Sequence, residues 1–321
     1  MQQAFKIGTR GSPLALVQAR DVRRRLAEAH GLAEEGQDSP FEIVIIKTSG
    51  DRIQDRALLE AGGKGLFTKE IEEALIDGNI DCAVHSMKDM PTKLPNGLEM
   101  TAILPREDPR DAWISPVAKT IKDLPQGAKI GTASLRRQAQ MLAFRPDLEI
   151  CLFRGNVDTR LAKLAGGEVD GTLLAAAGLN RLGRADEATA LLSIEQMLPA
   201  VAQGAVGVEA RTADNKAQTM LEPLNHVLTS QAIEAERAFL AELDGSCRTP
   251  IAGLAEIDAL GTLTLLGKVL SLDGKKIYET RRTGPVSDAT QIGRSAGQEL
   301  KQEAGEAFFA ELHKSVQGQT G

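Results

Sequence analysis

The sequence predicts an α/β protein with two similarly folded lobes and a third, smaller α+β domain. Three observations predict this arrangement. The first two thirds of the chain alternate short apolar segments with helical patterns, which is typical of βαβ units around a mainly parallel sheet. This alternation occurs twice, whereas the last third shows two-residue periodicity between two helices. At 321 residues, the chain also exceeds what one hydrophobic core normally organises.

The first lobe is expected to begin with a strand over 5–8. Ser12 then caps a helix that Pro13 opens and that extends to about His30, because a hydroxyl at the cap and proline at the first helical position both favour a helix start. The remaining elements of this lobe are expected at 42–47 (strand), 68–77 (helix) and 81–84 (strand).

The second lobe repeats the pattern. A strand over 129–131 leads to a helix that Ser134 caps. Further elements are expected at 149–153 (strand), 172–175 (strand) and 177–182 (helix), and a crossover over 199–211 follows with a strand at 206–209. In the last third, we expect a helix over 230–243, strands over 263–269 and 277–281, and a final helix from about 289 to 313.

Composition restricts the function classes. Hydrophobic residues make up 42% of the chain, charged residues 26% and aromatic residues only 3%, and the net charge is -6. Few aromatic side chains argue against base-stacking platforms, and the acidic balance argues against a general nucleic-acid binder. No segment approaches the about 20 apolar residues of a membrane span, and the first residues lack the apolar core of a signal peptide. We therefore expect a cytoplasmic protein without a membrane or nucleic-acid partner.

The segment 83–91 is the most informative part of the chain. A short apolar strand breaks off into a polar cluster in which Lys88 precedes Asp89, and Pro91 closes it. A carboxylate at the carboxyl end of a buried strand is where an open α/β sheet usually presents chemistry to a ligand. The alternative for this segment alone is a surface turn with a solvated Lys-Asp pair.

Basic residues recur at the predicted ends of strands and helices. Arg10 and Ser12 lie at a strand-to-helix junction, where free backbone N–H groups favour an anion, and Ser134 with Arg136 and Arg137 repeats this arrangement. Arg154, Arg160 and Arg181 occupy similar positions. A single such arginine is more often in a surface ion pair, but together they predict a polyanionic small ligand.

Two loops carry further candidates. Lys64 lies in a glycine-rich loop that lacks the spacing of a phosphate-binding loop but can reach an anion. Of the three cysteines, Cys82 and Cys151 lie in apolar strands and are expected to be inert. Cys247 follows a helix end beside Arg248, and a nearby cation stabilises a thiolate, so Cys247 is the candidate nucleophile. The alternative on this segment alone is a loop cysteine with no role. The odd, widely spaced set predicts neither a disulfide framework nor a metal site.

These segments together resemble the porphobilinogen deaminase (hydroxymethylbilane synthase) family. The resemblance extends through most of the chain, in the segments 10–16, 62–70, 83–89, 106–111, 131–138, 154–160, 203–207 and 243–250. It implies an enzyme of tetrapyrrole biosynthesis, a transferase that joins four porphobilinogen molecules head to tail with loss of ammonia and then releases hydroxymethylbilane by hydrolysis. The competing hypothesis is a non-catalytic, two-lobed binding protein for an anionic small molecule.

The resemblance also implies an architecture and a cofactor. It implies two lobes similar to periplasmic binding proteins, formed by 1–103 with 201–224 and by 104–200, and a third domain over 225–321. The implied cofactor is a dipyrromethane joined by a thioether to Cys247, although Asp244 and Ser246 depart from the usual cofactor loop. The family further suggests a monomer.

Residue by residue, the resemblance assigns catalysis to Asp89. It assigns the loop that closes over the site to Phe67 and Lys64. The residues that match its carboxylate-binding set are Arg10, Ser12, Lys64, Lys88, Ser134, Arg136, Arg137, Arg154, Arg160 and Arg181.

Overall fold

The computed structural model describes residues 4–52, 68–243 and 249–318. The chain divides into two compact units. Unit 1 comprises Met1–Glu107 and Ala205–Ser230, and unit 2 comprises Asp108–Gly204 and Gln231–Gly321. The chain therefore leaves unit 1 and returns to it once before it ends in unit 2. Within the described ranges, no helix has the length and apolar character needed to cross a membrane.

Unit 1 contains a five-stranded sheet with the order β2-β1-β3-β10-β4. Its strands are β1 (Phe5–Thr9), β2 (Phe41–Ile45), β3 (Cys82–Ser86), β4 (Leu98–Ile103) and β10 (Val206–Arg211). Its helices are α1 (Pro13–His30), α2 (Ser49–Arg52), α3 (Lys69–Ile76) and α7 (Asn215–Leu221). The strands β1, β2 and β3 are parallel, and β10 runs antiparallel between β3 and β4.

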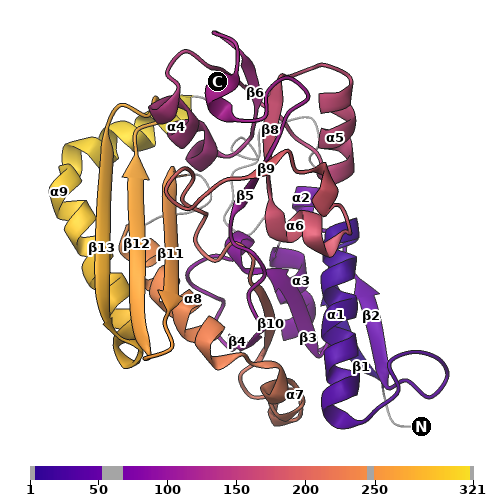
Figure 1. Cartoon of the computed structure of the whole chain (residues 1–321). Coiled ribbons are helices and arrows are strands. Elements are labelled where there is room, and N and C mark those ends of the chain that lie inside the picture. The colour runs from indigo at the N-terminus through magenta and orange to yellow at the C-terminus, as the bar shows by residue number, and fades with distance from the viewer. Residues whose placement is uncertain (1–3, 53–67, 244–248, 319–321) are drawn as a thin grey trace. The chain divides into compact units, whose positions relative to one another are not determined.

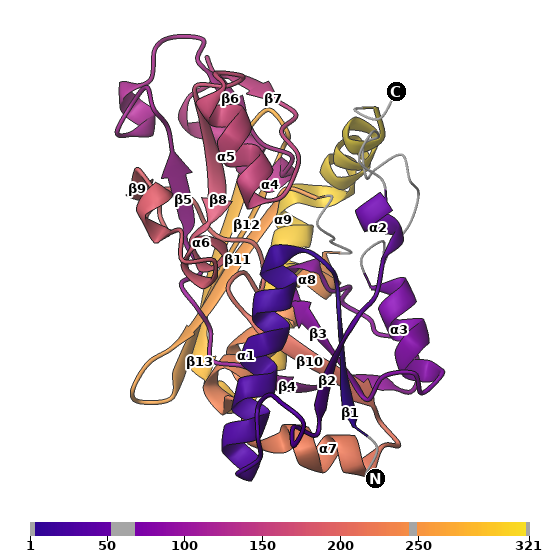
Figure 2. The same cartoon turned by 90° about the vertical axis from the view of Figure 1, so that its right-hand side faces the viewer.

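The two faces of this first sheet carry different helices. The side chain of Ser12 accepts a hydrogen bond from the Ala15 amide, and Gly31 ends α1 in the left-handed conformation at φ 62°, which glycine adopts without a steric penalty. α1 lies along the face that buries Ile7 and Val84 (Figure 2). α3 covers the opposite face, where Ile71 packs with Ala83. Successive residues of β3 therefore face different helices.

Unit 2 contains a second five-stranded sheet with the order β7-β6-β8-β5-β9. Its strands are β5 (Asp111–Ile114), β6 (Lys129–Gly131), β7 (Glu149–Cys151), β8 (Gly171–Ala175) and β9 (Ala190–Leu191). The helices beside it are α4 (Leu135–Phe144), α5 (Val157–Ala165) and α6 (Ala176–Arg181). One face packs Trp113 against Met141 of α4, and the other packs Leu174 against Leu161 of α5.

The first and second sheets share one register. Ile7 pairs with Cys82 in the first sheet, and Ile130 pairs with Gly171 in the second. Each pair belongs to a Lys-Ile-Gly-Thr segment, at 6–9 and 129–132, followed by a serine-capped helix. When the two sheets are aligned on these two pairs, β3 occupies the same position as β8, and β10 occupies the same position as β5.

The prediction of two similar α/β lobes with mainly parallel sheets is confirmed, and each sheet also contains one reversed strand, β10 in the first and β5 in the second. In each sheet three parallel strands are followed by two antiparallel pairings. The reason is the chain path, because β5 follows the step from unit 1 into unit 2 and β10 follows the step back. Each strand pairs directly with β8 or β3 and runs against it.

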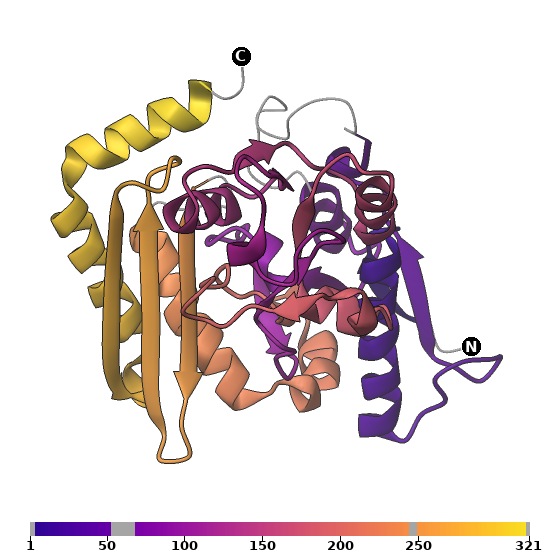
Figure 3. The ribbon, with the colours of Figure 1, turned by 45° about the horizontal axis from the view of Figure 1, so that its top comes forward.

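The third sheet also belongs to unit 2 and is antiparallel. Its order is β11-β12-β13, formed by β11 (Ile251–Ile257), β12 (Thr262–Leu270) and β13 (Ile277–Pro285). The helices α8 (Val227–Glu242) and α9 (Ala289–Gly318) lie beside it (Figure 1). Phe239 of α8 packs over the paired glycines 253 and 267. α9 changes direction at Gly305, where φ is 75° (Figure 3).

The expected antiparallel character of the last third is confirmed. Several strands and α-helices were absent from the sequence-based prediction, namely β4, β5, β9, β11, α2, α5 and α7.

Candidate functional site

Asp89 lies at the end of a short 3₁₀ turn, Met87–Asp89, that directly follows β3. Met87 and Met90 are buried, at 2% and 5% exposure, and flank the turn on the inside. The amide of Met87 donates to the Ala205 carbonyl, which fixes the start of the turn to the segment that enters β10. Asp89 itself is exposed. Buried anchors on both sides thus hold one carboxylate at the carboxyl end of a buried strand.

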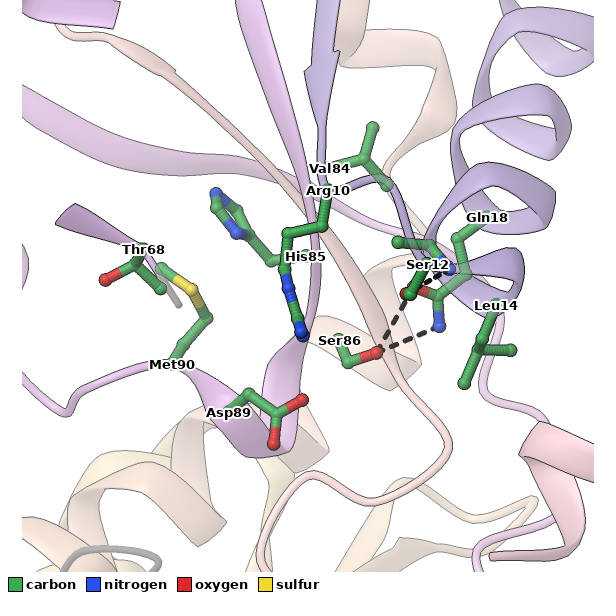
Figure 4. A pocket seen from close by; sticks show the side chains of 11 residues that line it. Arg10, Ser12, Leu14, Gln18, Thr68, Val84, His85, Ser86, Asp89 and Met90 are labelled. Carbon is green, nitrogen blue, oxygen red and sulfur yellow. Dashed lines mark hydrogen bonds between the residues drawn. The ribbon is translucent and has the colours of Figure 1, made fainter. Parts of the chain in front are cut away.

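A pocket opens beside this turn, entirely within unit 1. Arg10 and Ser12 line it from the segment after β1, and the side chain of Arg10 extends toward Asp89 (Figure 4). Gln18 of α1 donates through Nε2 to Ser86 Oγ at 3.0 Å, which ties the helix to the end of β3. The other residues that line the pocket are Leu14, Ala15, Thr68, Val84, His85 and Met90.

His85 forms the inner wall of this pocket together with Glu209 behind it. His85 Nε2 lies 3.0 Å from Glu209 Oε2, and the two side chains are 5% and 0% exposed. Both residues are on the α3 face of the sheet, where Glu72 of α3 is also buried. Burial and the neighbouring Glu209 carboxylate raise the pKa of Glu72.

Unit 2 contains a buried cluster of two arginines and one aspartate, whereas the buried group in unit 1 consists of one histidine and two glutamates. Asp111, at the start of β5, accepts hydrogen bonds at 2.7 Å from both Arg136 and Arg137. All three side chains are buried. Burial alone would raise the pKa of Asp111, but the two guanidinium charges reverse this and hold it well below its usual range. Gln203 also donates to Asp111, at 3.0 Å.

Further cations lie near this cluster. Burial, followed by repulsion from Arg137 and Arg154, lowers the pKa of Arg160 to about 10. Arg160 Nε donates to the Gly155 carbonyl, and Arg181 donates to the Gly204 carbonyl at 2.8 Å. Because burial and neighbouring cations contribute to the lowered pKa of Arg160 and of Arg136, an anion with several carboxylates would stabilise these guanidinium groups.

The predicted site residues therefore fall into three groups. Arg10, Ser12, Lys88 and Asp89 belong to unit 1, and three of them line one pocket. Ser134, Arg136, Arg137, Arg154, Arg160 and Arg181 belong to unit 2. Arg136 and Arg137 share Asp111, and Ser134 caps the helix that carries them by accepting from the Arg137 amide. Lys64, Phe67 and Cys247 lie outside the described residues.

Several polar residues of these sites were missed from the sequence, among them Gln18, His85, Asp111 and Glu209. Asp111 closes the Arg-Glu-Asp-Pro-Arg-Asp segment and His85 lies in the most informative segment of the chain, so both were visible as parts of motifs. Glu209 interrupts an apolar strand, and a carboxylate inside such a strand is itself a signal, because charged side chains are almost never fully buried unless they are paired.

Comparison with protein families identifies the class. Residues 5–219 match the family model described as "Porphobilinogen deaminase, dipyromethane cofactor binding domain". Residues 230–302 match the model described as "Porphobilinogen deaminase, C-terminal domain". The chain belongs to the porphobilinogen deaminase family.

Close relatives agree with this assignment. The porphobilinogen deaminase of Nitrobacter winogradskyi is 54% identical over 303 residues, and that of Nitrobacter hamburgensis is 54% identical over 305 residues. Each comparison covers 94% of this chain and 94% of the relative. The expected activity of a hydroxymethylbilane synthase, the transferase class and the dipyrromethane cofactor are confirmed.

Among solved structures, the chain is similar to periplasmic binding proteins at low identity. A periplasmic substrate-binding protein of an ABC transporter from Coxiella burnetii gives a TM-score of 0.41 at 14% identity, covering 68% of this chain and 91% of its own. A Salmonella typhimurium periplasmic binding protein described for high arginine specificity gives 0.39 at 12% identity, covering 71% and 94%. The fold assignment itself comes from the strand orders and the family.

Proposed function

We propose that Asp89 is the carboxylate that carries the condensation step of this hydroxymethylbilane synthase. The observation that supports this most directly is its position: it is exposed beside a pocket that Arg10 and Ser12 also line, on a turn anchored by two buried methionines. A carboxylate fixed before the reaction stabilises positive charge without having to reorganise. The family match does not favour the alternative of a non-catalytic binding protein.

The reaction requires charge stabilisation and proton acceptance, and the Asp89 carboxylate can provide both. Loss of ammonia from porphobilinogen leaves an electron-deficient azafulvene, and a nearby carboxylate stabilises its protonated form. When bound, the dipyrromethane supplies the free pyrrole carbon that attacks. That carbon must then lose its proton, which Asp89 is placed to accept. Overall, the C–N bond of the substrate breaks, a C–C bond forms, and the pyrrole proton leaves with ammonia as ammonium.

The basic residues are proposed to hold the acetate and propionate groups of the pyrrole rings. The chemistry of the donors fits such a polyanion, because guanidinium groups pair with carboxylates in a bidentate manner. The lowered pKa of Arg160 supports an anion near Arg154 and Arg137, since the carboxylates would relieve the repulsion among these cations. Arg10, Ser12 and Lys88 would act in unit 1, and Ser134, Arg136, Arg137, Arg154, Arg160 and Arg181 in unit 2.

The remaining assignments follow from the family motifs. We infer that Cys247 anchors the dipyrromethane and that Lys64 and Phe67 belong to a loop over the site. We also infer three domains, 1–103 with 201–224, 104–200 and 225–321, which the separate sheets support. A cytoplasmic monomer is inferred on the same basis.

The test combines intact mass with turnover. The purified protein should exceed its polypeptide mass by two porphobilinogen units less their ammonias, and a Cys247→Ala variant should not. Asp89→Asn should fold normally and lose about 10²–10⁴-fold in kcat. Asp77→Asn, which alters another exposed carboxylate of unit 1, is the matched control and should keep full turnover. Undiminished turnover in Asp89→Asn would contradict the role of Asp89.

A further inference from the structure

The buried trio of His85, Glu209 and Glu72 stands directly behind the pocket. His85 lines the pocket, Glu209 receives His85 Nε2 at 3.0 Å, and Glu72 is 8% exposed on the same face of the sheet. Among the described residues, Glu72 Oε1 and Glu209 Oε1 are buried without a hydrogen-bond partner. Three ionisable groups are thus buried together, although burying a polar group without a hydrogen-bond partner costs free energy.

The second sheet provides an internal comparison for this trio. The shared register makes Leu174 equivalent to His85, and Ile114 equivalent to Glu209. Leu161 of α5 corresponds to Glu72 of α3, because each lies nine residues before the aspartate that precedes the equivalent strand. These three residues form part of one hydrophobic cluster.

The fold therefore accepts apolar side chains at all three positions. Replacing a buried ionic pair by well-packed apolar residues is often neutral or stabilising, so stability does not explain why the first sheet keeps the polar trio. A functional explanation has to come from the pocket that His85 lines.

The charges around His85 favour a group that exchanges protons. Glu209 faces it from β10, Glu72 from α3, and Arg10 and Asp89 line the same pocket. Burial and Glu209 raise the pKa of Glu72, which favours its neutral form, and Glu209 is the carboxylate in hydrogen-bond contact with His85. Within the described part of the chain, the other ring nitrogen, Nδ1, makes no hydrogen bond.

We propose that His85, oriented through Nε2 by Glu209, is a second proton-handling residue of this site. The proposal rests on the proposed role of Asp89. Ammonia leaves first, and the pyrrole carbon then attacks. As the C–H bond of that carbon breaks, Asp89 takes the proton, which passes across the pocket that both residues line to Nδ1 of neutral His85. The resulting imidazolium, paired with Glu209, gives the proton to the ammonia released in the preceding step, which diffuses away as ammonium. Each cycle thus restores Asp89 and His85 to their starting forms.

The main test places the apolar residues of the second sheet at the equivalent positions of the first sheet. The double variant His85→Leu with Glu209→Ile should keep or raise Tm, while kcat falls by about 10²-fold. Intact mass should be recorded first, so that kcat is compared between proteins with equal cofactor loading. His226→Asn, which alters a histidine of the same unit that bonds Thr229 away from the pocket, is the control and should leave kcat unchanged.

A second variant decides the matter if the double variant fails to fold. Glu209→Gln keeps the shape and a hydrogen-bond acceptor but removes the charge, so kcat should fall and its pH profile should change shape. ¹⁵N NMR of the chain, which has only four histidines, should show His85 as the Nε2–H tautomer in the native protein. An Nδ1–H tautomer would contradict the orientation that the relay needs.

The outcomes separate this inference from the proposed function. If Asp89→Asn loses turnover while Glu209→Gln and the double variant keep native kcat and an unchanged pH profile, the relay through His85 is wrong and the role of Asp89 stands. If Asp89→Asn itself keeps full turnover, the proposed function fails and the relay fails with it. Reduced kcat in the double variant with unchanged Tm supports the relay.

Discussion

The first and second sheets share strand order and register, yet they bury charge on different faces. The first sheet places His85 and Glu209 on the face covered by α3. The second places Asp111 with Arg136 and Arg137 on the face covered by α4. The equivalent strand positions of the other sheet are apolar: Leu174 for His85, Ile114 for Glu209 and Val206 for Asp111. The equivalent positions of the helices, counted from their serine caps, are apolar in α1: Leu14 for Arg136 and Ala15 for Arg137.

This difference separates the demands of the fold from those of the chemistry. Because equivalent positions hold His85 in one sheet and Leu174 in the other, the backbone does not require a particular side chain there. The second sheet carries two guanidinium groups against one carboxylate, which suits an anionic ligand. The first sheet carries carboxylates around an imidazole, which suits proton transfer. Two copies of one architecture have thus been specialised by a few buried side chains.

The largest effect is expected where a single partner is removed from a buried ionic cluster. Asp111→Asn leaves the charges of Arg136 and Arg137 without their carboxylate, and should lower the free energy of unfolding by about 3–5 kcal/mol. Urea denaturation followed by circular dichroism measures this. A loss below about 1 kcal/mol would mean that the cluster is not a structural unit.

A triple variant tests whether the apolar solution of the first sheet also works in the second. Asp111→Val with Arg136→Leu and Arg137→Ala copies Val206, Leu14 and Ala15, and should be more stable than Asp111→Asn because no buried charge is left unpaired. Cofactor loading, measured by intact mass, should nevertheless be lost. Normal loading in this variant would remove Arg136 and Arg137 from the carboxylate-binding set.

A smaller loss of stability, equal in the two sheets, is expected when a hydrogen bond that both sheets contain is removed. Asp81 accepts the amide of Lys6, and Asp170 accepts the amide of Lys129, each at 2.7 Å. Asp81→Ala and Asp170→Ala should each lower the free energy of unfolding by about 1.5–3 kcal/mol, the range for hydrogen bonds to charged groups. Unequal losses in urea denaturation would show that the two sheets are less alike in energy than in register.

The smallest effect concerns pH and the trio of the first sheet. Burial and Glu209 raise the pKa of Glu72 above its ordinary value of 4.5, so ionising Glu72 destabilises the folded state as pH rises through the raised value. Glu72→Leu, which copies Leu161, should therefore increase stability at pH 8 relative to the native protein. Below pH 4.5 this gain should disappear. Thermal unfolding at both pH values measures it, and a gain that grows toward acid pH would reverse the sign.

Sequence patterns predicted the parallel strands and the helices α1, α4 and α6 that follow three of them. Apolar runs, a serine cap and a proline at the first helical position are local signals, and they located α1 almost to the residue. β5 was missed because its four residues start with a charged side chain, Asp111, whose burial depends on two arginines from α4. The repeated Lys-Ile-Gly-Thr segment was a visible signal that the two lobes share a register.

For the site, sequence motifs pointed to Asp89 and Arg10, and the structure places both at one pocket. The pairing of His85 with Glu209 could not be predicted in this way. The two residues are 124 positions apart, and only the register of β3 with β10 brings them together. Long-range pairing of this kind has no local signature in a sequence.

The insertion of β10 between β3 and β4 has a consequence for synthesis on the ribosome. The second sheet is encoded without interruption by 108–204, so it can close as soon as that stretch has emerged. The first sheet begins at residue 5 but lacks its fourth strand until Arg211 has been made. During that interval, β3 and β4 expose edges that other chains could pair with. The lobe that is translated first is completed last, and it therefore has the greater need of chaperone protection.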